Sequence, residues 1–154
     1  MKKFNLVATG GTFDILHDGH IALLSKSFES SQKTIIGLVG DALAARKQKN
    51  TINDYHTRLE ALVGLIEKKF PGSEYQISKL DDDFGPAVLE GEVEALVVSD
   101  ETRHQGDVLN KLRSEKDLPP VQVLVVPMVL AKDGLRISTT RIKNSEIDSE
   151  GNLS

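Results

Sequence analysis

The chain has 154 residues, of which 39% are hydrophobic and 27% charged, and this fits one globular domain with a full core. Its formal net charge is −4 and it has no long basic block, which argues against nucleic acid as the main partner. Cysteine is absent, which excludes disulfides, a thiolate metal site and a cysteine nucleophile.

Short apolar runs alternate with amphipathic runs along the chain. The apolar runs predict five strands, at residues 4–9, 33–40, 75–80, 94–99 and 121–126. The amphipathic runs predict helices at residues 18–30, 42–46, 53–69, 107–116 and 138–147, with a short helix beginning at 87–89. Such strands, apolar throughout and alternating with helices, are typical of a parallel sheet covered on both faces. We therefore expect an α/β fold, with a Rossmann-like five-stranded parallel sheet and helices on both faces.

The pattern predicts one domain over residues 1–148 and a flexible C-terminal tail over residues 149–154. No apolar signal region opens the sequence and no apolar run reaches 18 residues, so we expect a cytoplasmic protein that does not enter a membrane. No exposed apolar helix face demands a partner, which favours a monomer.

The segment from Gly10 to His20, GGTFDILHDGH, joins the first strand to the first helix. Gly10 and Gly11 predict a turn whose backbone can come close to a ligand. A helix N-terminus offers unpaired amides to phosphate, and His17 and His20 share one face of the first turn. With the Thr12 hydroxyl these groups suit an anionic phosphate. The alternative is a plain turn followed by two solvated histidines.

The same segment has neither the Gly-Lys-Ser/Thr of a Walker loop nor a G-x-G-x-x-G fingerprint. It resembles the T/H-x-G-H signature of the nucleotidylyltransferase superfamily, whose members join a nucleotide monophosphate to a phosphorylated acceptor and release pyrophosphate. The resemblance implies that His20 contacts the nucleotide phosphates and stabilises the transition state, with His17 beside it. On this basis the expected nucleotide-binding residues of the segment are Gly10, Gly11, Thr12, Phe13 and Asp14.

A second motif, ISTTRI, lies near the C-terminus. Hydroxyls and amides of Ser138 and Thr139 at a helix start can hold the outer phosphates of a nucleotide. Arg141 lies three residues after Ser138 and can reach the same anion with its guanidinium. The motif resembles the I-S-S/T-T-x-I/V element of the same superfamily, which closes over the ATP phosphates. The alternative is an ordinary helix cap with a surface arginine.

The polar stretch after the second strand offers a ligand for a second phosphate. In nucleotidylyltransferases of this type a lysine near this point holds the acceptor phosphate and the transferring phosphate, and the resemblance assigns this role to Lys47. Arg46 and Lys49 are open alternatives, and so is a solvated basic surface. Arg58, further along the chain, is expected to be a surface residue on a helix.

A third run, VVSDET at residues 97–102, narrows the resemblance. The chain resembles the archaeal/eukaryotic-type pantetheine-phosphate adenylyltransferase family over nearly its whole length, from Phe4 to about Ile142. The bacterial counterpart carries an R-G-x-R run at this place, and this sequence does not. We include Ser99 in the nucleotide site, while helix capping is the alternative role for residues 99–102. The other residues that support the resemblance are Tyr55, Arg58, Gly106, Asn110, Arg113 and the DFGP run at 83–86.

The resemblance implies that ATP and 4′-phosphopantetheine react to give dephospho-coenzyme A and pyrophosphate. The acceptor is already a phosphate, so positioning and electrostatics suffice without a covalent intermediate. Mg²⁺ is expected on the triphosphate, held mostly by ATP and water and not by a protein metal site. The alternatives are another nucleotidylyltransferase, using CTP or a different phosphorylated acceptor, and a nucleotide-binding module without catalysis.

Overall fold

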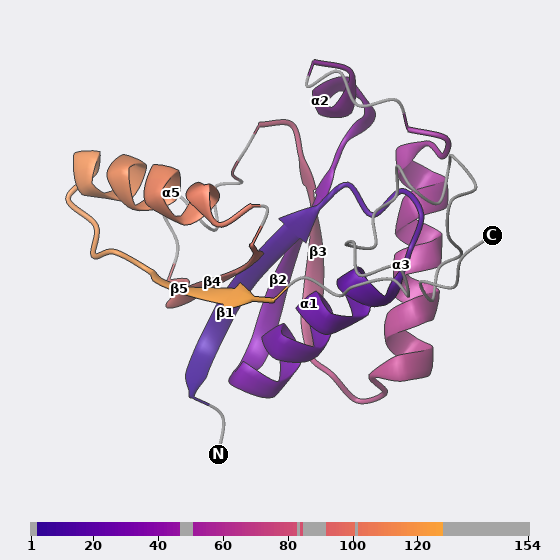
Figure 1. Cartoon of the computed structure of the whole chain (residues 1–154), viewed down its shortest axis with the longest axis horizontal. Helices are drawn as coiled ribbons and strands as arrows, with labels where there is room; N and C mark the ends of the chain where they lie inside the picture. The colour runs from indigo at the N-terminus through magenta and orange to yellow at the C-terminus, as the bar shows by residue number, and fades with distance from the viewer. Residues whose placement is uncertain (1–2, 47–50, 83, 85–91, 101, 128–154) are drawn as a thin grey trace.

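The computed structural model describes residues 3–46, 51–82, 84, 92–100 and 102–127. They form five strands: β1 (Phe4–Gly11), β2 (Ser31–Val39), β3 (Tyr75–Leu80), β4 (Ala95–Ser99) and β5 (Gln122–Val126). The helices are α1 (Asp18–Ser30), α2 (Asp41–Arg46), α3 (Tyr55–Lys69) and α5 (His104–Glu115) (Figure 1). Each predicted element within these ranges is present, with shifted ends. The helices predicted at 87–89 and 138–147 and the tail at 149–154 lie outside the described residues.

All pairings in the sheet are parallel, and the strand order is β3-β2-β1-β4-β5. This confirms the predicted α/β class and five-stranded parallel sheet. The chain runs outward from β1 to β3 and then returns to place β4 on the other side of β1. The strand order therefore reverses between β1 and β4, which is where ligands of such sheets bind, beyond the carboxyl ends of the strands.

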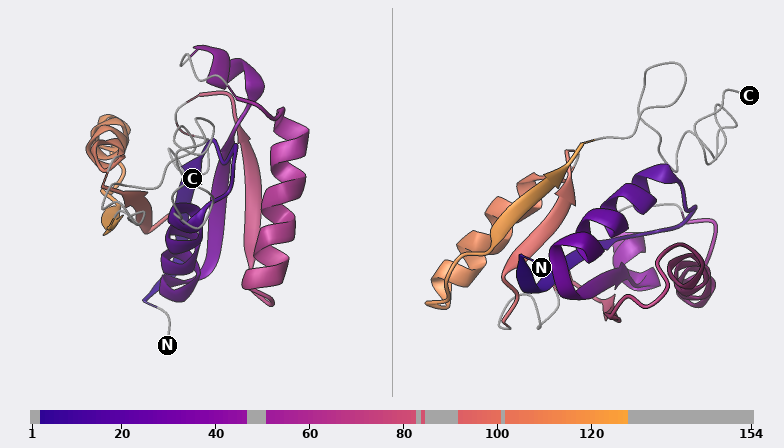
Figure 2. Two further views of the ribbon diagram at one scale, coloured as in Figure 1. Left: turned by 45° about the vertical axis from the view of Figure 1, so that its right-hand side comes forward. Right: turned by 90° about the horizontal axis from the view of Figure 1, so that it is seen from below.

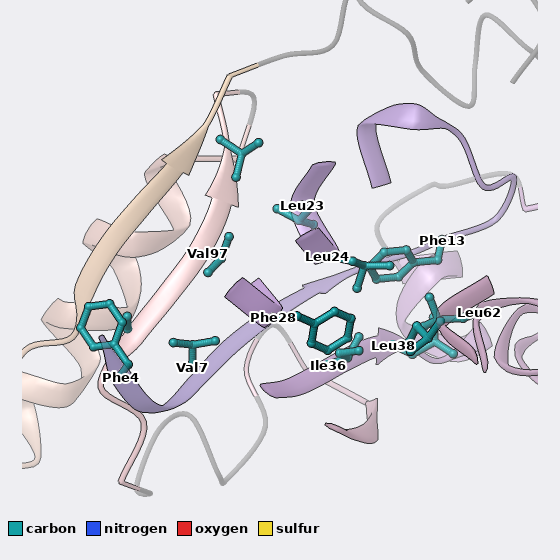
Figure 3. Close-up of a cluster of buried hydrophobic side chains, with 13 residues drawn as sticks. Phe4, Val7, Phe13, Leu23, Leu24, Phe28, Ile36, Leu38, Leu62 and Val97 are labelled. Carbon is teal, nitrogen blue, oxygen red and sulfur yellow. The ribbon is translucent and has the colours of Figure 1, made fainter. Parts of the chain in front are cut away.

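Helices cover both faces of the sheet, as the apolar strands predict. On one face, α1 and α3 pack on side chains such as Val7, Ile36 and Val97 (Figures 2 and 3). On the other face, α5 contributes Leu109 to a second cluster with Ala8. Neighbouring residues of β1 thus point into different cores, which is the strict alternation of a strand. No helix within the described ranges is long and apolar enough to cross a membrane.

The first strand is longer than predicted. Gly10 and Gly11 pair with Gly37 and Leu38 of β2 and close the strand, so the turn begins at Thr12 and not at the glycines. A Cβ on Gly10 would lie 3.0 Å from the carbonyl oxygen of Gly37, which explains the glycine by the close approach of two strands. The prediction of a glycine turn was wrong in this respect.

Candidate active site

The site is built around residues 12–17, called loop 12–17 below, which connects the carboxyl end of β1 to α1. His17 is the N-cap of α1: its Nδ1 accepts from the amide of Gly19 at 3.0 Å, and its own amide donates to Nδ1 of His20 at 3.2 Å. The two imidazole rings stack with centroids 4.0 Å apart. The predicted convergence of the two histidines is confirmed, and it is produced by a capping box made of imidazoles.

These hydrogen bonds decide where the imidazole protons are. Both Nδ1 atoms of the pair accept from backbone amides, so a neutral ring carries its proton on Nε2. Burial, and secondarily the charge of His17, lowers the pKa of His20 to about 3. His20 is therefore neutral over the physiological range, with its proton on Nε2, and its contact with a phosphate stays a prediction.

Phe13 is the strained residue of the loop. Its φ is +50°, a left-handed conformation that an aromatic residue rarely adopts. Its side chain is 1% exposed and lies in the core cluster with Leu24 and Leu38 (Figure 3). Its ring centroid is 4.9 Å from that of His20. The side chain of Phe13 is thus a core residue that supports His20, and only its backbone could meet a nucleotide.

Thr12, beside it, places a buried hydroxyl in the same loop. Its Oγ1 has no hydrogen-bond partner among the described residues. A buried hydroxyl without a partner costs free energy unless something else completes it. An anionic oxygen at the predicted phosphate position would do so.

Asp14 turns its carboxylate toward residues 52 and 53. Oδ2 accepts from the amide of Ile52 at 2.8 Å and Oδ1 from the amide of Asn53 at 3.0 Å. The amide group of Asn53 returns a bond of 3.0 Å to the carbonyl oxygen of Asp14. Asp14 therefore joins loop 12–17 to the segment that precedes α3, and its assignment to nucleotide binding stays a prediction.

Arg58 corrects one expectation of the sequence. It is fully buried, not a surface residue, and its guanidinium donates to three backbone carbonyls and to Asp41. A signal was present, because Arg58, Leu62 and Ile66 follow each other at intervals of four and form the buried stripe of α3. Its acceptors could not be read from the sequence, since Thr12 lies 46 positions away.

Ser99 ends β4 next to the strand-order switch, as predicted. Its amide donates to Oγ1 of Thr102 at 3.2 Å and the two hydroxyl oxygens lie 3.1 Å apart. Gly106, another residue that supports the resemblance, has a packing role, because a Cβ on it would lie 2.4 Å from Cγ2 of Val123. Ser99 shares the carboxyl edge of the sheet with loop 12–17, and its contact with a nucleotide stays a prediction.

Several predicted ligands lie outside the described residues: Lys47, Lys49, Ser138, Thr139 and Arg141. Arg46, the remaining alternative for the acceptor phosphate, ends α2. Its guanidinium donates to the carbonyl of Asp81 and lies 3.8 Å from a carboxylate oxygen of Asp82. Arg46 is thus engaged at the carboxyl end of β3.

Comparison with known proteins shows the family of the chain. The family model described as cytidylyltransferase-like matches residues 8–145, which defines the class of the chain. The chain is 40% identical over 151 residues to a phosphopantetheine adenylyltransferase of Methanosarcina acetivorans, covering 96% of this chain and 94% of that one. It is 38% identical over 154 residues to the Pyrococcus horikoshii protein of the same name, covering 99% and 96%. The chain therefore belongs to the phosphopantetheine adenylyltransferase family.

Solved structures share the architecture. A protein of unknown function from Archaeoglobus fulgidus superposes with a TM-score of 0.71 at 28% identity, covering 82% of this chain and 89% of that one. Tyrosyl-tRNA synthetase of the same organism gives 0.62 at 12% identity, covering 91% and 60%. The second likeness concerns the fold alone.

Proposed function

We propose that this protein transfers the adenylyl group of ATP to 4′-phosphopantetheine, giving dephospho-coenzyme A and pyrophosphate. The observation that carries the proposal is the similarity, at 34–40% identity over 95% or more of the chain, to proteins named phosphopantetheine adenylyltransferase. The stacked pair of His17 and His20 at the strand-order switch supports it, because imidazole N–H donors suit a nucleotide phosphate.

The reaction forms one bond and breaks another at the α-phosphorus. An oxygen of the acceptor phosphate attacks it, and the bond to the bridging oxygen of the β-phosphate breaks as pyrophosphate leaves. In our proposal Nε2–H of His20 and the hydroxyl of Thr12 stabilise charge on the α-phosphate, and His17 contacts the neighbouring phosphate. Lys47 holds the acceptor phosphate. The outer phosphates are assigned to Ser138, Thr139 and Arg141.

Mg²⁺ accompanies the triphosphate in this proposal and neutralises part of its charge. The described residues contain no group of three or more His, Asp or Glu side chains placed to hold a metal. A magnesium ion carried by phosphate oxygens and water fits such a site, because Mg²⁺ keeps several waters when it is bound with a nucleotide. A cytoplasmic location and a monomeric state stay predictions from the sequence.

Pyrophosphate release measures the proposed reaction directly. ATP and CTP are each offered with 4′-phosphopantetheine and with two other phosphorylated acceptors, and products are weighed by mass spectrometry. We expect dephospho-coenzyme A from ATP and 4′-phosphopantetheine. Turnover only with CTP or another acceptor would move the protein to a different nucleotidylyltransferase activity. Tight ATP binding without turnover on any acceptor would make it a binding module.

A further inference from the structure

Arg58 binds three separate segments of the chain: residue 12, residues 39–41 and residue 53. Its Nη1 donates to the carbonyl oxygens of Thr12 at 2.9 Å and Val39 at 2.7 Å. Its Nε donates to the carbonyl of Asn53 at 3.1 Å, and Nη2 to Oδ1 of Asp41 at 2.8 Å. In Figure 1 loop 12–17 leaves the tip of β1 and passes the first turns of α3, where Arg58 lies. One guanidinium thus joins the ends of β1 and β2 to α2 and α3.

Arg58 and Asp14 hold the same short segment from both directions. Arg58 binds the carbonyl of Asn53, and Asp14 binds the amides of Ile52 and Asn53. Two further hydrogen bonds hold loop 12–17 itself. Arg58 binds the carbonyl of Thr12, and the carbonyl of Asp14 accepts from the side chain of Asn53. The backbone is therefore held on both sides of Phe13, the residue with a φ of +50°.

We propose that Arg58 is a positioning residue for the transfer reaction, and this inference rests on the proposed function. By holding the backbone on either side of Phe13, it keeps the Phe13 ring beside His20 and Thr12 in its place. It thereby sets the two donors that meet the α-phosphate. Arg58 itself is buried beneath the loop and touches no reacting atom in this proposal.

The chemistry of an arginine side chain suits this positioning role. Arg58 is 0% exposed, and its charged partner Asp41 is 54% exposed, so the cation is desolvated more fully than its counterion. An ion pair with an exposed partner adds little net stability, so the main structural contribution of Arg58 is its hydrogen bonds to three backbone carbonyls. The planar fork of arginine does supply several donors in fixed directions, which an ammonium group cannot copy.

The chain offers a matched control. Arg113 is also buried, at 3% exposure, and its Nε donates to the carbonyl of Pro119 at 2.9 Å. It lies in α5, on the opposite face of the sheet from α1 and α3. Replacing Arg113 disturbs a buried guanidinium without touching loop 12–17.

The test compares Arg58→Lys, Arg58→Met and Arg113→Met in the full chain. We expect kcat to fall about 10-fold in Arg58→Lys and about 100-fold in Arg58→Met, the scale of a small misplacement of catalytic groups, with KM for ATP changed less than about threefold. Arg113→Met should keep kcat within about twofold per folded molecule. Histidine NMR gives a readout independent of turnover: the ring signals of His17 and His20 should shift in the Arg58 variants, while those of His104 stay in place.

Each result decides the matter. Unmoved signals of His17 and His20 with wild-type kcat in Arg58→Lys would overturn the positioning role. So would an increase of KM alone, because that indicates uniform binding and not placement of donors. If Arg58→Met does not fold, Arg58→Lys decides by itself. If the wild-type protein transfers no adenylyl group, the proposed function fails, and the histidine signals still test whether Arg58 sets loop 12–17.

Discussion

The two sides of the strand-order switch hold their loops by different means. Apart from the local capping box of His17 and His20, loop 12–17 is held by side-chain hydrogen bonds that span long stretches of sequence: 46 positions from Arg58 to Thr12 and 39 from Asn53 to Asp14. Around α5 they are short, with 11 positions from Asn110 to Val121 and 6 from Arg113 to Pro119. Both sides use arginine and asparagine side chains to bind backbone groups, but over different separations in the sequence.

The difference indicates two tasks for these hydrogen bonds: the long-range bonds assemble a site, and the local bonds close a turn. A local bond, such as that of Arg113, stops a helix and directs the chain into the next strand. A long-range bond forms only once several segments have met, so it places groups from each segment relative to the others. Damage near loop 12–17 should therefore reach activity, whereas damage near α5 should remain a matter of stability.

The largest expected effect is a loss of stability that differs between the two buried arginines. Arg58→Met leaves three backbone carbonyls without the donor that joins them and should lower the free energy of unfolding by about 3–5 kcal/mol. Arg113→Met removes a shorter-range bond and should cost about 1–3 kcal/mol. Urea unfolding of both variants measures the difference. Equal losses would mean that the two arginines play the same part.

The next effect concerns the histidines. His20→Ala removes a donor expected to act in the transition state, so kcat should fall about 10²–10³-fold, or about 2.7–4 kcal/mol. His104→Ala, at the start of α5, should leave kcat within about twofold. Steady-state kinetics on folded protein, checked by circular dichroism, decides this. An unchanged kcat in His20→Ala would remove His20 from the mechanism.

Sequence patterns predicted more of the fold than of the site. Apolar runs and their alternation with helices predict the strands, and the parallel order brings the ends of β1 and β4 together. The turn was misplaced because Gly10 and Gly11 continue the ladder with β2, a partner that local pattern does not reveal. The hydrogen bonds that join loop 12–17 to residues 52–58 were missed for the same reason, because those of Asp14 and the one from Arg58 to Thr12 join positions 38 or more apart.

The third effect is a pH dependence. In the folded chain the pKa of His20 is lowered to about 3, while the unfolded value is near 6.5, so below pH 6.5 the unfolded state binds the extra proton. The contribution of His20 to the free energy of unfolding should be fully present above pH 6.5 and should be lost as the pH falls toward 3. The loss should amount to about 1–2 kcal/mol between pH 7 and pH 5. Unfolding of the wild type and of His20→Ala at both pH values isolates this contribution by subtraction. Parallel losses in the two proteins would contradict it.

The smallest effect distinguishes two buried threonine hydroxyls. Oγ1 of Thr9 donates to the carbonyl of Val97 at 2.9 Å, whereas Oγ1 of Thr12 has no partner among the described residues. Thr9→Val should therefore cost about 1 kcal/mol of stability, while Thr12→Val should cost nothing or stabilise the ligand-free chain. With ATP present, Thr12→Val should be the variant that suffers more. ATP raises the melting temperature by binding to the folded state, and Thr12→Val should lose part of that rise while Thr9→Val keeps it. Thermal unfolding of both variants with and without ATP measures all four values, and a full ATP-induced rise in Thr12→Val would exclude its hydroxyl from the phosphate site.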